Sequence, residues 1–155
     1  MNRRSLIVFS IAFTLLLSGC SFGKSKSSSD LVSVTAPSIV GCYVAKLKED
    51  IFTLKISSQD GLKVSANLAF KNAYKDSSTG SFEGTFDGTI LTGIYTFASE
   101  GSVSRSELFF KKIKEGFQQG FGPAEMKGDL STFVRPLSIT WNDSYLFTKS
   151  TECGA

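Results

Sequence analysis

The sequence contains no histidine among its 155 residues. Without an imidazole, the chain cannot form a Ser-His-Asp triad, a Cys-His pair or a zinc site with histidine ligands. It also lacks a glycine-rich phosphate-binding motif of the Walker or dinucleotide type. These absences favour a protein that is not an enzyme, with no catalytic residues, no metal and no cofactor.

A hydrophobic run long enough to cross a membrane is also missing. The most apolar stretch, Leu6–Leu17, spans roughly 18 Å as a helix, against roughly 30 Å for a bilayer core. It follows Arg3 and Arg4 and precedes small residues, an order typical of an export signal. We therefore expect a signal helix over residues 1–19 and no transmembrane span.

The residues Leu17-Ser18-Gly19-Cys20 end this signal. They resemble the lipobox of bacterial lipoprotein precursors, in which the cysteine thiol is acylated and becomes the new N-terminus. The resemblance implies that lipid on Cys20, such as palmitate, holds the mature chain to a membrane in the cell envelope. Ser21 follows and no acidic run follows it. With two membranes, this implies the outer membrane, facing the periplasm; with one, it implies the outer face of the cell membrane.

Removal of the signal leaves fifteen basic and fourteen acidic side chains, because Arg3 and Arg4 leave with it. A chain so close to neutral gives no electrostatic case for nucleic-acid binding. Residues 20–38 are small, polar and without periodicity, so we expect a lipidated flexible tether that spans roughly 23 Å on average. Residues 39–155 are then one domain.

Cysteine is scarce: besides Cys20, the chain has only Cys42 and Cys153, one near each end of the predicted domain. Disulfides persist in the compartment to which the signal sends the chain. A bridge between the two would close a loop of over a hundred residues and contribute roughly 4 to 5 kcal/mol in the chain-entropy model. Two unrelated thiols are the alternative.

Apolar and polar residues alternate with period two from Ile39 onward, and no segment after the signal keeps a period of 3.6. This pattern predicts half-buried strands. Turn signals separate eight or nine short strands, which predicts an antiparallel meander. It closes into a lipocalin-like or streptavidin-like barrel, or folds as a β-sandwich. The barrel is favoured because closure removes exposed edges and brings Cys42 near Cys153.

The apolar pattern also predicts hairpin registers. A three-residue loop, Gln59–Gly61, would set Ile56 opposite Val64 and keep both on the apolar face, with Gly61 left-handed in a bulge.

A two-residue Asp87-Gly88 turn would set Phe82 opposite Gly93, so that the ring covers the bare glycine backbone.

At Glu100-Gly101 a two-residue turn would place two serines beside two aromatic residues on the inner face. The same register would turn Arg105 and Glu107 outward, and a loop one residue longer or shorter would invert it. Small-molecule sites often combine apolar walls with a few hydroxyls. The candidate residues for lining such a barrel pocket are Tyr43, Tyr95, Phe97, Ser104 and Ser106.

Three residues on the outer face, Ile90, Ile94 and Phe109, form a candidate protein-contact patch. Two functions therefore remain open. In the first, a non-catalytic barrel binds a small apolar or amphipathic ligand. In the second, the barrel has a filled core and serves as an interaction or inhibitor module that contacts another envelope protein.

The predicted domain as a whole resembles small bacterial lipoproteins with β-rich domains. The resemblance is carried by Gly41-Cys42-Tyr43, by Phe82–Phe97 with Ser99-Glu100-Gly101, and by Gly116–Gly122. It implies a β-rich fold and an envelope location, and it implies no particular activity.

Overall fold

The computed structural model describes residues 37–99, 101–135 and 137–153. The predicted signal helix, the lipidation site Cys20 and most of the tether lie outside these residues. The described part is all-β, as predicted, and no helix in it is long and apolar enough to cross a bilayer. Its strands are β1 (Gly41–Leu47), β2 (Asp50–Asp60), β3 (Lys63–Lys71), β4 (Ser78–Phe86), β5 (Ile90–Ser99), β6 (Ser102–Ile113), β7 (Gly116–Phe121), β8 (Ala124–Lys127), β9 (Leu130–Phe133) and β10 (Thr140–Ser150).

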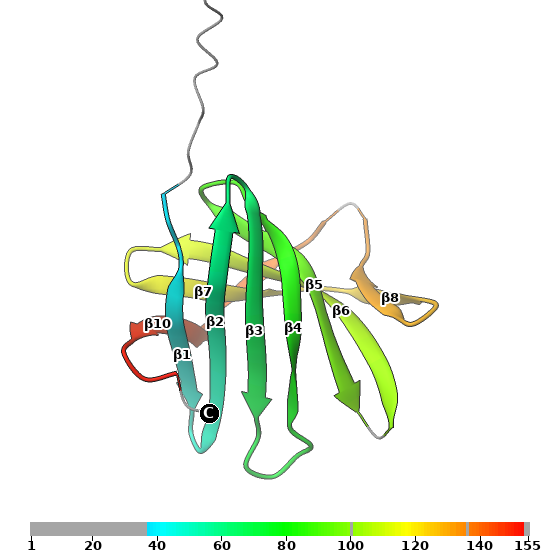
Figure 1. Ribbon diagram of the computed structural model, residues 1–155. Helices are drawn as coiled ribbons and strands as arrows, with labels where there is room; N and C mark the ends of the chain where they lie inside the picture. Colours follow the sequence, from blue (N-terminus) through cyan, green and yellow to red (C-terminus); the bar gives the residue numbers. More distant parts are fainter. Residues whose placement is uncertain (1–36, 100, 136, 154–155) are drawn as a thin grey trace, which may run out of the picture. The chain divides into compact units, whose positions relative to one another are not determined.

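Eight of the ten strands form a closed antiparallel barrel (Figure 1). Strands β1 to β7 follow one another around the wall, and β10 closes it by pairing with both β7 and β1. This confirms the prediction of a barrel rather than a sandwich. The other two strands, β8 and β9, form a hairpin outside the ring, where β9 runs parallel to β6 at Arg105 and Ser106.

Aromatic side chains fill the barrel interior. Five phenylalanines and several aliphatic residues there are almost completely inaccessible to solvent. The ring of Phe110 packs edge-on against Phe82 and Phe147, with centroids 5.9 and 5.5 Å apart. Phe117 packs in the same way against Tyr43 at 5.0 Å. An eight-stranded barrel has an interior wide enough for side chains to fill or for one small ligand, and in this barrel buried side chains, five of them phenylalanines, occupy it.

The predicted disulfide is present. Cys42 and Cys153 are bonded, with Cα atoms 5.6 Å apart and a separation of 111 positions in sequence. Barrel closure makes this possible, because it pairs Cys42 with Ser150 of β10. The bond fixes the C-terminal tail against the outer face of the wall.

The register predicted from the Glu100-Gly101 turn is confirmed. Tyr95 lies opposite Ser106, and Phe97 lies opposite Ser104. Ile94 lies opposite Glu107, so Glu107 points outward as expected.

The register predicted for the hairpin of β2 and β3 is wrong. Ile56 lies opposite Ala66 instead of Val64, because β2 has a bulge between Ile56 and Ser58. The extra residue at the bulge keeps the apolar residues of both strands on the inner face. Gly61 is left-handed at the turn as predicted, with φ of 58°.

The register predicted for the hairpin of β4 and β5 is also wrong, since Phe82 lies opposite Tyr95 instead of Gly93. The Asp87 carboxylate accepts the N–H groups of Thr89 and Ile90, both at 2.7 Å, and this moves the turn along the chain. The Phe82 ring still covers Gly93, where an added Cβ would lie 2.6 Å from the ring. This close approach explains why residue 93 is a glycine.

Candidate functional site

The two tyrosines of the predicted pocket lie toward opposite ends of the barrel. Tyr43 is near the start of β1, and its hydroxyl donates to the Ile39 carbonyl at 2.9 Å. Tyr95 is in the second half of β5, and its hydroxyl hydrogen-bonds to the Ser78 Oγ at 3.0 Å. Burial raises the pKa of both phenols above the ordinary value. Tyr43 therefore does not line a common pocket with the other candidates.

The other four candidates lie together. The rings of Tyr95 and Phe97 stack at 4.7 Å, and the half-buried Ser104 and Ser106 face them from β6. Phe70 of β3 packs edge-on against Tyr95 at 5.6 Å. This end of the interior combines aromatic rings with hydroxyls, as predicted for a small-molecule site.

Sequence reasoning missed one polar residue of the interior, Gln119. It lies opposite Phe110 and is only 5% exposed, and its side-chain oxygen has no hydrogen-bond partner among the described residues. An unpaired buried carbonyl costs about 1 to 3 kcal/mol. Gln119 is two residues from the buried Phe117, so the period-two alternation could have placed it inside the barrel.

The predicted outer patch is not an open apolar surface. Phe109 points outward, opposite Thr92, but the β8–β9 hairpin covers it. The ring of Phe133 packs edge-on against Phe109 at 5.2 Å, and Phe109 is 7% exposed. Ile90 and Ile94 are half-buried. Phe109 therefore does not offer an open contact to a partner, because Phe133 of the same chain already packs against it.

Glu107 fastens the hairpin to the barrel. Its carboxylate accepts hydrogen bonds from the Thr132 hydroxyl at 2.8 Å, the Phe133 N–H at 2.9 Å and the Arg135 guanidinium at 2.8 Å. Burial raises the pKa of Glu107, but these three donors and the charge of Arg135 outweigh burial and leave the pKa below its ordinary value.

We expect Glu107→Gln to loosen the hairpin. A lowered folded-state pKa means that the contact stabilises the protein above the pKa of an unfolded glutamate, and that this stability is lost as pH falls through the folded-state pKa. Hydrogen exchange, corrected for intrinsic rates, should therefore show residues 124–133 deprotected in Glu107→Gln at neutral pH and in the wild type only on acidification. Each hydrogen bond to the charged group is worth about 1.5 to 3 kcal/mol.

The matched control is Glu125→Gln, since Glu125 forms an exposed ion pair with Lys127 within β8. It should leave exchange at neutral pH unchanged. Equal deprotection in both variants would show that Glu107 does not hold the hairpin.

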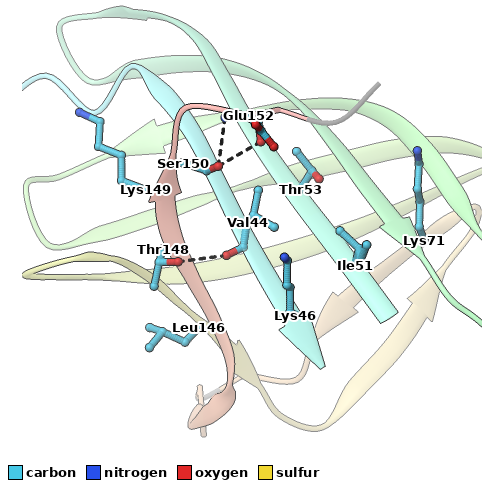
Figure 2. Close-up of a pocket in the computed structure, with 10 residues that line it drawn as sticks. All are labelled: Val44, Lys46, Ile51, Thr53, Lys71, Leu146, Thr148, Lys149, Ser150 and Glu152. Atoms are coloured by element: carbon cyan, nitrogen blue, oxygen red, sulfur yellow. Dashed lines mark hydrogen bonds between the residues drawn. The ribbon is translucent and has the colours of Figure 1, made fainter. Parts of the chain in front are cut away.

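A hollow of about 660 Å³ lies on the outside of the wall, across β10, β1 and β2 (Figure 2). Three lysines, from three different strands, lie around it, and Glu152 of the C-terminal tail is its one carboxylate. Ser150 holds that tail by hydrogen bonds to the backbone of Glu152 at 3.1 Å. The lining residues are Val44, Lys46, Ile51, Thr53, Lys71, Leu146, Thr148, Lys149, Ser150 and Glu152.

A second hollow, of about 330 Å³, continues this surface over β2, β3 and β4. Thr53 and Lys71 line both hollows, and Cys153 borders the second one. Its other lining residues are Lys55, Asn67, Leu68, Ala69 and Thr79. This surface could not be predicted from alternation, because its residues come together only through the pairing of several strands.

Within the described ranges, no group of three or more histidine, cysteine, aspartate or glutamate residues could hold a metal ion. Comparisons of the chain with protein-family models, with curated proteins and with solved structures find no match.

Proposed function

We propose that the protein is a lipid-anchored component of the cell envelope whose barrel is a non-catalytic binding module, and that it binds its partner on the outside of the wall. One observation carries the proposal. Aromatic side chains fill the interior, whereas hollows of about 660 and 330 Å³ lie outside, over β10, β1, β2, β3 and β4. Of the two functions left open by the sequence, this supports the interaction module with a filled core.

A second candidate, the binding of a small amphipathic ligand inside the barrel, is supported by Gln119. Its unpaired oxygen could accept a hydrogen bond from such a ligand. The two candidates differ in a simple observable. Native mass spectrometry of protein purified from its own membranes would show an organic molecule of constant added mass only if the interior is the binding site.

Site-specific photo-crosslinking in the native host tests the outer-wall proposal. A photoreactive residue at Asn67, which is exposed in the second hollow, should give an adduct with an envelope component. The control places the photoreactive residue at Val103, which is 63% exposed at the start of β6, and this position should give no adduct. If neither position gives an adduct and an organic ligand co-purifies with the protein, the result would favour ligand binding inside the barrel instead.

The lipid anchor rests on the Leu17-Ser18-Gly19-Cys20 motif and is tested separately. Intact-mass and peptide measurements on protein from the native host should find a chain that begins at a diacylated Cys20. More than one acyl chain, at about 0.8 kcal/mol per buried CH₂, anchors a protein stably. A free Cys20 thiol in that protein would rule the anchor out.

A further inference from the structure

We propose that the outer face of β1, β2 and β3 binds an anionic glycan, a sugar polymer that carries carboxylate or phosphate groups. The inference rests on the proposed function, because it names the ligand class of the outer-wall surface. We call this surface the basic face. Its residues that line the two hollows are Val44, Lys46, Ile51, Thr53, Lys55, Asn67, Ala69 and Lys71.

The register sets the spacing of the positive charges. Lys46 lies opposite Ile51, which in turn lies opposite Lys71. The two lysines thus flank Ile51 in one row across three strands, with Cα atoms roughly 10 Å apart. Lys55 follows on the same side of β2, opposite Asn67. With Lys149 of β10, four ammonium groups therefore line the two hollows.

Among the residues that line the two hollows, Glu152 of the C-terminal tail is the one carboxylate, against four lysines. β1 and β3 contain no carboxylate, and those of β2 are at its two ends, Asp50 and Asp60. Asp50 is engaged elsewhere, because its carboxylate accepts the Ala73 N–H at 2.8 Å. The face is a local concentration of positive charge in a chain that is almost neutral after removal of its signal, and it complements an anionic ligand.

Hydroxyl and amide side chains line both hollows, beside apolar ones such as Val44 and Leu68. Thr53 and Thr148 line the first hollow, and Asn67 and Thr79 line the second (Figure 2 shows the first). These groups donate and accept hydrogen bonds, as sugar hydroxyls do. Lysines bind carboxylate or phosphate groups as point charges. The two kinds of side chain together match a ligand that is both a polyol and an anion.

The same face lacks what other anionic macromolecules require. Single-stranded nucleic acids stack their bases on aromatic side chains. No outward residue of β1, β2 or β3 is aromatic. Extended peptides add to a free strand edge, but β2 and β3 are paired on both sides. The glycan is therefore favoured over these partners.

The test is an affinity measurement on the full protein, purified in detergent from its native membranes. Polygalacturonate oligomers are the probe, and neutral dextran of equal length, polyglutamate and vesicles containing phosphatidylglycerol are the comparisons. The triple variant Lys46→Gln, Lys55→Gln, Lys71→Gln removes the charges of the basic face. The triple variant Lys75→Gln, Lys114→Gln, Lys127→Gln removes three exposed charges elsewhere and is the matched control.

The expected result is saturable binding of polygalacturonate that falls roughly tenfold or more in the basic-face variant, changes less than twofold in the control and weakens with added salt. Three results would overturn the glycan proposal. They are an equal loss of polygalacturonate affinity in both variants, a lack of saturable binding, and an equal affinity for polyglutamate, vesicles or dextran. The melting temperature of each variant shows that it is folded, and Lys55→Gln alone replaces the triple variant if that one unfolds. A failed glycan test with an Asn67 crosslink to a protein would leave the outer-wall proposal intact.

Discussion

Replacing Phe117 by alanine is expected to lower the free energy of unfolding by about 3 to 5 kcal/mol. Phe117 is 0% exposed and packs edge-on against Tyr43 on one side and Phe86 on the other, at 5.0 and 6.2 Å. The loss combines the transfer free energy of the ring with the cavity that a rigid barrel wall cannot close. Urea unfolding, followed by the fluorescence of Trp141, the one tryptophan of the chain, measures it.

The control for this variant is Tyr74→Ala. Tyr74 is 84% exposed in the loop after β3, and substitutions at such positions change stability by about 0.5 kcal/mol or less. A Phe117→Ala variant as stable as Tyr74→Ala would show that the interior is loose enough to accommodate the loss, contrary to the packing described above.

The second large effect is expected from the disulfide. The double variant Cys42→Ser, Cys153→Ser should be about 4 to 5 kcal/mol less stable than the wild type, because the bond closes a long loop and limits the unfolded chain. Its cysteines are 111 residues apart in sequence. A reductant should lower the wild type to the stability of the variant and leave the variant unchanged. A wild-type protein insensitive to reductant would contradict the predicted contribution.

Local chemistry made part of this fold predictable. Alternation along β5 and a two-residue turn at Glu100-Gly101 specify which residues of β5 and β6 face each other, and the structure has that register. The pairing of Cys42 with Cys153 followed from barrel closure, since closure makes the first and last strands neighbours.

Non-local contacts were not predictable in the same way. The bulge after Ile56 changes the register without changing which side chains face inward, so alternation cannot reveal it. Phe109 was assigned correctly to the outer face, but its cover, Phe133, comes from a four-residue strand that pairs with β6 in parallel. The basic face was not predictable for the same reason, because Lys46, Lys55 and Lys71 come together only through the register of three strands.

The central claim is that the barrel interior is structural and that binding occurs on the outer wall. The most direct measurement is a crystal structure of the protein purified from its own membranes. The account predicts an interior occupied by the protein's own side chains around Phe82, Phe110 and Phe147, with at most a water on Gln119. An organic ligand inside the ring would contradict it.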